Sequence, residues 1–213
     1  MSSSVTIERP ATSVRTRETS TMQILNVAVR FTIVTTLLLG IGYPLVVTAL
    51  AQLFMRNKAN GQIIMRNGEV IGSAIIGQSF TSTGYFHSRP SAAGNGYDAT
   101  SSGGSNLGPT NKKLVDRIDG DVASWHKQDA GARGNVPIGL VTTSASGLDP
   151  DISPADALYQ VPMIAAARHL REDSVRALVQ SHIQGRQFGF LGEPTVNVLE
   201  LNLALDQLQA GSH

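Results

Sequence analysis

The stretch FTIVTTLLLGIGYPLVVTALAQLFM, residues 31–55, decides the architecture of this chain because it contains no charged side chain. Arg30 and Arg56 bracket it. About 20 apolar residues in a helix suffice to cross the hydrocarbon core of a membrane, so a run of this length can span with some tilt. The sequence therefore predicts a single transmembrane anchor helix, which we place at residues 26–56.

Three residues that are unusual in a water-soluble helix lie in the middle of this run, namely Gly40, Gly42 and Pro44. Membrane helices tolerate such residues, and small side chains let a neighbouring helix approach closely. We therefore expect these positions to lie in the interface with the membrane helices of a partner protein.

A cleaved signal peptide is the alternative interpretation of the same stretch, because Ala49–Ala51 has the small-x-small form of a cleavage site. The apolar run before that site is longer than the usual apolar region of a signal peptide, and the 30 residues ahead of it are also long for a signal. A permanent anchor is therefore favoured. Residues 1–25, rich in Ser, Thr and Arg, are predicted to form a disordered N-terminal tail.

The composition excludes several classes of protein. The 213 residues include 17 Lys and Arg against 16 Asp and Glu, so there is no basic excess for binding nucleic acid. The absence of cysteine excludes disulfides, thiolate metal sites and cysteine nucleophiles. The five histidines form neither an i, i+4 pair nor an H-E-x-x-H arrangement, and Ser146 lacks the G-x-S-x-G context of a hydrolase. We expect no catalytic residues, no metal and no tightly bound cofactor.

Beyond the anchor, residues 57–210 are predicted to form one compact soluble α+β domain. Two apolar runs flank Asn67-Gly68, a dipeptide that supplies the positive φ angles of a tight hairpin turn. We therefore expect antiparallel strands at residues 62–66 and 69–76.

Amphipathic helices follow in the second half of the domain. Their expected N-caps are Thr110 or Asn111, Ser153, Asp173 or Ser174, and Asn197 paired with Glu200. Pro162 is expected to kink or shorten the second of these helices, and Gly185 to end the third. Short strands are expected at residues 138–142 and 195–198.

Residues 77–110 run through Gly, Ser, Asn and Pro with few apolar positions, and loops of this length are usually functional or disordered. Tyr85, Phe86 and Arg89 stand out within the segment. Since aromatic side chains beside an arginine make good interface anchors, we expect the segment to be ordered by contact and these three residues to face a partner.

The sequence SGGSN within this segment is the nearest approach to a phosphate cradle, through Gly103, Gly104 and Ser105. It lacks the lysine of a P-loop, and the next helix is expected only about six residues later, which weakens an anion site built from helix-terminal amides. These residues alone favour a structural turn over a nucleotide site.

Several longer motifs occur in a fixed order: GSAIIGQSF, GYFHSRPSAA, SGGSNLGPTN, LVTTSASGLDPDISP and VNVLELNLALD. Through them the chain resembles the C subunit of the Kdp-type potassium-transporting P-type ATPase. The resemblance, which covers residues from about 25 to 208, implies an accessory subunit that is not itself an enzyme. Its partners would be a channel-like, potassium-selective subunit and an ATP-hydrolysing pump subunit. It would stabilise their assembly and act as a catalytic chaperone that promotes ATP binding.

This resemblance gives a functional interpretation to Gln160, a polar residue between Leu158 and Val161. In a chaperone of this kind its amide, with Gly103, Gly104 and Ser105, could contact ATP or the pump subunit. The structural alternative is a partly buried amide that neighbouring backbone satisfies. In that alternative, this chain would meet ATP only through the complex. The resemblance implies that potassium is the ion that the complex transports.

The resemblance also implies an inner-membrane protein of bacteria with a cytoplasmic N-terminus and an extracytoplasmic domain. Basic residues near the span are equal in number on its two sides and so give no orientation.

A stand-alone exported enzyme or binding module held by one helix is the alternative function. Two positions depart from the family, since an acidic residue is expected where Gly139 stands and a basic one where Met163 stands.

Overall fold

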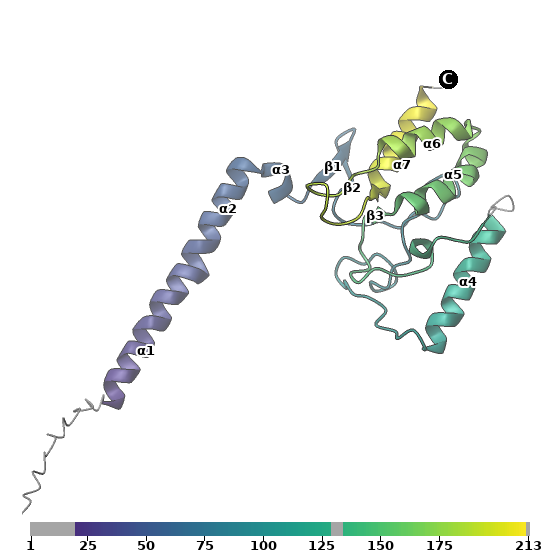
Figure 1. Ribbon diagram of the computed structural model, residues 1–213. Coiled ribbons are helices and arrows are strands. Elements are labelled where there is room, and N and C mark those ends of the chain that lie inside the picture. Colours follow the sequence, from purple (N-terminus) through teal and green to yellow (C-terminus); the bar gives the residue numbers. More distant parts are fainter. Residues whose placement is uncertain (1–19, 129–133, 212–213) are drawn as a thin grey trace, which may run out of the picture. The chain divides into compact units, whose positions relative to one another are not determined.

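The computed structural model describes residues 20–128 and 134–211 (Figure 1). The chain divides into two compact units between Arg56 and Asn57. The predicted tail falls for the most part on residues outside this description. Its last residues, from Thr21 on, are helical, so the anchor helix begins earlier than the sequence indicated.

The first unit is one long apolar helix, Thr21–Phe54, of 34 residues, which by length and composition could cross a membrane. It consists of α1 (Thr21–Thr35), a π-helical segment η1 (Thr36–Gly42) and α2 (Tyr43–Phe54). None of its side chains is buried within the chain. This is the pattern of a helix whose surroundings are lipid or other subunits.

The π-helical segment has a direct cause in the sequence. Pro44 has no N–H to donate to the carbonyl four residues earlier, so one α-helical hydrogen bond is missing at this point. The N–H of Tyr43 instead donates to the carbonyl of Leu38, five residues back. A π-bulge of this kind keeps the helix continuous while widening it at Gly40 and Gly42.

A short helix α3 (Arg56–Ala59) includes the boundary between the units, and the second unit continues with the hairpin of β1 (Ile63–Arg66) and β2 (Glu69–Ser73). Asn67 and Gly68 have φ angles of 53° and 86°, which confirms the predicted turn. The second strand is shorter than predicted, because only an isolated bridge between Ser73 and Ile76 continues it.

Helices and a second small sheet complete this unit: α4 (Lys112–Gln128), a 3-10 turn η2 (Ile138–Leu140), β3 (Asp151–Ile152), α5 (Pro154–Arg168), α6 (Glu172–Ser181), β4 (Val196–Asn197) and α7 (Val198–Ala210). Strands β3 and β4 pair antiparallel, with Ile152 opposite Val196. Three predicted N-caps are confirmed, because the side chains of Asn111, Ser153 and Asn197 each accept a backbone N–H of the first turn. The architecture is the predicted α+β domain behind one anchor helix.

Two local predictions are wrong, the strand at residues 138–142 and the bounds of the third helix. Residues Ile138–Leu140 form a 3-10 turn after Pro137, and the hydroxyl of Thr142 donates to the carbonyl of Ile138. Helix α5 continues through Pro162 to Arg168, with buried residues on both sides of the proline, so the proline does not shorten the helix and a kink there stays a prediction. Helix α6 begins at Glu172, with Arg171 as its cap, and ends at Ser181, before Gly185.

The core of the domain surrounds α5, which packs against α6 (Figure 1). Fully buried side chains come from α5, α6, α7 and the two short strands; they include Ile152, Val161, Ile164, Val175, Val179, Val196 and Leu201. Phe86, from the long segment without regular structure, is also part of this core. The order of that segment therefore depends on contacts with α5 and α7.

Candidate functional site

Two buried amide side chains hold the segment 77–110 against the helices. Asn202 of α7 accepts the N–H of Phe86 at 2.8 Å and donates to its carbonyl at 3.0 Å. Gln160 of α5 does the same for the next residue, accepting the N–H of His87 at 2.7 Å and donating to its carbonyl at 3.1 Å. Each amide thus pairs with one residue as a neighbouring strand would. We call this pair of amides the amide clamp.

The clamp determines what Gln160 can do. Its side chain is 1 % exposed, and its amide nitrogen makes a further hydrogen bond, to the carbonyl of Asp156. Two of its three hydrogen bonds are therefore to backbone 73 residues away in the chain, and one is to backbone four residues away. The sequence did not identify Asn202, although an amide inside the apolar helix pattern LELNLALD was a usable signal, because a buried amide needs partners.

Tyr85 and Phe86, two of the expected interface residues, lie on opposite sides of the clamped segment. The Phe86 side chain is fully buried in the core. The Tyr85 ring is half-buried, and the Arg168 guanidinium lies 4.3 Å from its centroid. Arg168 also pairs with Asp206 at 2.9 Å. Both aromatic residues are therefore already engaged within the domain, and a contact of Tyr85 with a partner stays a prediction.

Arg89 fastens the clamped segment to the loop before β3. Its guanidinium forms an ion pair with Asp149 at 3.3 Å and donates to the carbonyls of Thr142 and Thr143. It is about a quarter exposed. These bonds give Arg89 a structural role in the domain, and a role toward a partner would have to be additional to it.

The stretch Gly103–Ser105 lies extended along residues 144–147 and is not the turn that we expected. The N–H of Gly103 and the hydroxyl of Ser102 both donate to the carbonyl of Ser146. A Cβ on Gly104 would lie 3.1 Å from the carbonyl oxygen of Ala145, so glycine permits this close approach. Helix α4 begins only at Lys112, so its N-terminal amides do not adjoin the glycines in sequence.

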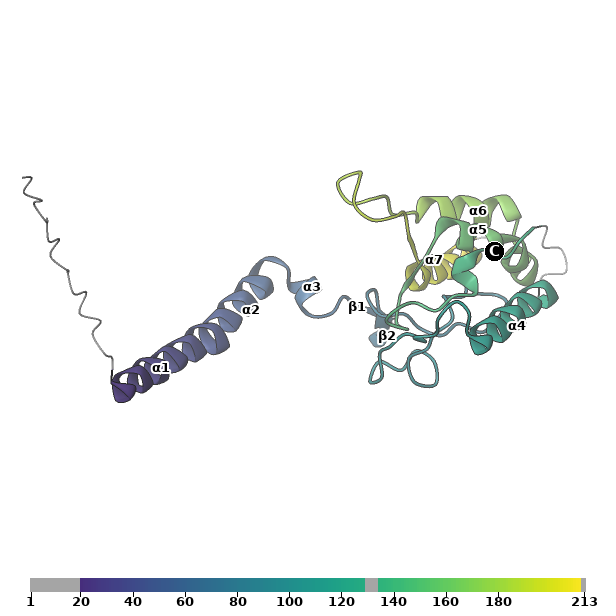
Figure 2. The same ribbon diagram turned by 60° about the horizontal axis from the view of Figure 1, so that its bottom comes forward.

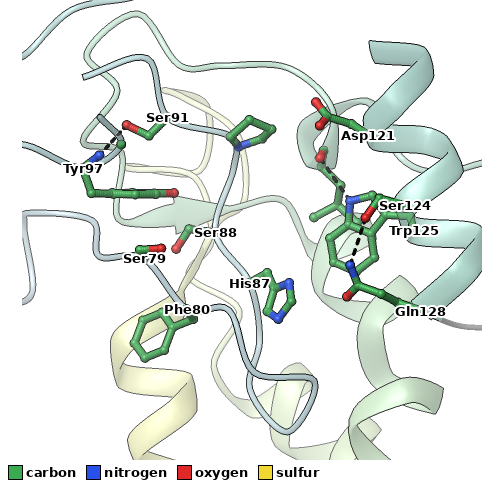
Figure 3. A pocket seen from close by; sticks show the side chains of 13 residues that line it. Ser79, Phe80, His87, Ser88, Ser91, Tyr97, Asp121, Ser124, Trp125 and Gln128 are labelled. Carbon is green, nitrogen blue, oxygen red and sulfur yellow. Dashed lines mark hydrogen bonds between the residues drawn. The ribbon is translucent and has the colours of Figure 1, made fainter. Parts of the chain in front are cut away.

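A cleft of about 320 Å³ opens between the clamped segment and α4 (Figure 3). His87 and Trp125 face each other there, with ring centroids 5.4 Å apart. Burial lowers the pKa of His87, and one of its ring nitrogens lies 2.9 Å from the carbonyl oxygen of Ser82. Serine hydroxyls, the rings of Phe80 and Tyr97 and the carboxylate of Asp121, which is paired with Arg117, also line the cleft. The lining of the cleft therefore consists largely of aromatic rings and hydroxyl groups.

No metal centre emerges among the described residues, since no three His, Cys, Asp or Glu side chains converge there. The two positions that depart from the expected family pattern are both enclosed. Met163 is 6 % exposed in the core. A Cβ on Gly139 would lie 2.1 Å from a carboxylate oxygen of Asp156, so a side chain at this position requires Asp156 to move.

Comparison with known proteins gives one consistent result. The family model described as K⁺-transporting ATPase, c chain, matches residues 25–207. A protein of Koribacter versatilis named potassium-transporting ATPase KdpC subunit is 59 % identical over 182 residues, covering 85 % of this chain and 93 % of the relative. A protein of Acidobacterium capsulatum with the same name is 57 % identical over 187 residues, covering 88 % of this chain and 100 % of the relative.

Proposed function

Since this chain belongs to the family of K⁺-transporting ATPase c chains, we propose that it stabilises the assembly of a high-affinity potassium uptake complex and promotes ATP binding by its pump subunit. It is a subunit of that complex rather than the catalytic unit, and potassium is the ion that the complex transports. The partners we propose are a channel-like, potassium-selective subunit and an ATP-hydrolysing pump subunit. The observation that carries the proposal is a family match that extends over both the anchor helix and the domain.

We place the chain in the inner membrane of a bacterium, with the N-terminus in the cytoplasm and the domain outside. The single long apolar helix supports a membrane-anchored subunit. The widened segment at Gly40, Gly42 and Pro44 would pack against helices of the partners, because small residues allow close approach there.

Promotion of ATP binding is then indirect. In the proposed topology the domain does not meet cytoplasmic ATP, so the effect travels through the packed anchor helix. The hydrogen bonds of the domain support this view, because the Gln160 amide is already used by His87 and Asp156, and the N–H of Gly103 by Ser146. A nucleotide at either place would have to displace contacts that hold the domain together.

One labelling experiment tests the topology on which this argument depends. The chain has no cysteine, so Ser102→Cys introduces a single thiol, at an exposed position. In the assembled complex we expect an impermeant thiol reagent to label this variant in intact spheroplasts. Labelling only after permeabilisation would place the domain in the cytoplasm and reopen a direct nucleotide site at Gly103, Gly104, Ser105 and Gln160. The cysteine-free wild type measures the background.

A further inference from the structure

The loop between α6 and β4 projects from the domain (Figure 2). Its base is closed by two backbone hydrogen bonds between Gln184 and Thr195 and by an ion pair of Arg186 with Glu193 at 2.6 Å. Nearer the tip, Gln187 and Leu191 exchange two hydrogen bonds of 2.9 Å. The loop is therefore a small hairpin whose tip is fixed relative to its base.

The tip of this hairpin exposes large apolar side chains. Phe188 is 86 % exposed, Phe190 70 % and Leu191 47 %. Phe188 also has a φ angle of +54°, a region that bulky residues rarely occupy. Strain and exposed aromatic rings both cost stability or solubility, and strain of this kind is concentrated at functional sites. We call Phe188, Phe190 and Leu191 the aromatic tip.

An acidic pocket of about 320 Å³ adjoins the base of the same hairpin, since Glu193 and Thr195 form part of its wall. Asp149, Asp151 and Asp156 also line it, with Arg89 as its one cation among the described residues, and Arg89 is paired with Asp149. Ile138, 76 % exposed, lies at its rim.

Asp156 leaves one buried polar atom beside this pocket without a partner in the described part of the chain. Its side chain is 2 % exposed, and one carboxylate oxygen accepts the N–H of Ser153. The other oxygen, Oδ1, is buried and has no hydrogen-bond partner in the described part of the chain. Neither Asp156 nor Asp151 forms an ion pair with a described residue, although the Asn197 amide donates to a carboxylate oxygen of Asp151 at 3.1 Å. A buried carboxylate in this state calls for a cation or a donor from outside.

We propose that the aromatic tip and the acidic pocket form one docking surface for a partner subunit of the complex, which supplies an apolar cleft for the rings and a basic side chain for the pocket. The proposal rests on the proposed function and adds the surface that does the binding. Rigid aromatic side chains anchor protein interfaces because little conformational entropy is lost when they bind. A long basic side chain would lay its stem against Ile138 and place its charge among the carboxylates.

A lipid bilayer is the other surface that could receive exposed aromatic rings. The acidic pocket argues against it, because anionic lipid headgroups attract basic segments and repel carboxylates. The fixed, strained conformation of the hairpin also suits a shaped protein cleft, whereas a fluid lipid surface needs no particular geometry. A protein partner is therefore the occupant to which the chemistry points.

Crosslinking in the assembled complex tests this surface. The photoreactive residue p-benzoylphenylalanine replaces Phe190 in the full chain, which is expressed together with the other subunits and irradiated in membranes. We expect an adduct with a membrane subunit of the same complex. The same residue in place of Val115, a half-exposed apolar position on α4, is the matched control and should give no such adduct.

Substitutions give a second measurement, the amount of this chain recovered with a tagged partner subunit. Phe188→Ser combined with Phe190→Ser should lower recovery about tenfold or more, as truncation of anchor residues does. Val115→Ser should leave it unchanged. Asp151→Asn should lower recovery severalfold, while Asp116→Asn, which removes an exposed acid of α4, should not.

The outcomes separate this proposal from the proposed function. If the wild-type chain does not co-purify with the other subunits, the proposed function itself fails. If the wild type co-purifies but position 190 crosslinks only to phospholipid, or to nothing, the docking surface is wrong and the accessory role stands. Normal recovery of the double serine variant would overturn the surface in the same way.

Discussion

Gln160→Ala should destabilise the domain markedly, because it leaves two backbone groups of His87 without partners. An unsatisfied buried polar group costs about 1–3 kcal/mol. Because His87 is only partly buried, the two groups together should cost about 2–4 kcal/mol rather than the full sum. For a domain of this size about 1 kcal/mol corresponds to 2–4 °C, and we expect the Tm to fall by about 5–10 °C.

Thermal unfolding of the purified chain, followed by circular dichroism, measures this loss. Gln180→Ala, at an exposed position on α6, is the matched control and should change the Tm by no more than about 2 °C. Hydrogen exchange at the Phe86 and His87 amides should accelerate in the Gln160 variant. If both the Tm and the exchange rates stay at wild-type values, the clamp does not hold the segment.

The second arm of the clamp gives a test of cooperation. Asn202→Ala alone should lower the free energy of unfolding by a similar amount, since it leaves the N–H and the carbonyl of Phe86 without their partners. The double variant with Gln160→Ala should lose less unfolding free energy than the two single variants together. A segment that is released from the helices at one residue is already partly released at the next. Strict additivity would mean that the two amides act on independent parts of the structure.

Two further predictions concern single positions. Gly139→Ala should lower the Tm, because the new Cβ would fall on the buried carboxylate of Asp156 and disturb the first turn of α5; a Tm at or above that of the wild type would refute the contact. For His87, burial lowers the folded-state pKa below the unfolded value near 6.5, so the unfolded chain binds the proton more tightly. The contribution of His87 to the free energy of unfolding should therefore be complete above pH 6.5. It should be lost as the pH drops through 6.5 toward the folded-state pKa. The difference in unfolding free energy between wild type and His87→Gln should show this loss, whereas His126→Gln, at an exposed position, should keep the wild-type pH dependence.

Features of the fold that depend on a few adjacent residues could be predicted from the sequence. The uncharged run at residues 31–55, the turn at Asn67-Gly68 and the cap at Ser153 each follow from local chemistry. The boundaries were less accurate where the tertiary structure decides them. Helix α5 passes through Pro162, because burial of the residues on both sides outweighs the hydrogen bond lost at the proline.

The candidate site was much less predictable, because its contacts join residues far apart in the chain. The sequence singled out Gln160 but gave no means of finding His87 as its partner, 73 residues away. It missed Asn202 and Arg168 for the same reason. Phe188 and Phe190 were missed because only the fold shows that their rings are left exposed.

These contacts change which residues are available to carry a function. Polar groups that suggested a nucleotide site, at Gln160 and at Gly103, are occupied by the domain's own backbone. The unused chemistry lies elsewhere, in the exposed rings of the aromatic tip and the unpartnered oxygen of Asp156. In the proposal above, these groups bind a protein partner. We therefore infer that the domain acts on its complex by contact, and that crosslinking from Phe190 is the most direct way to find which subunit it touches.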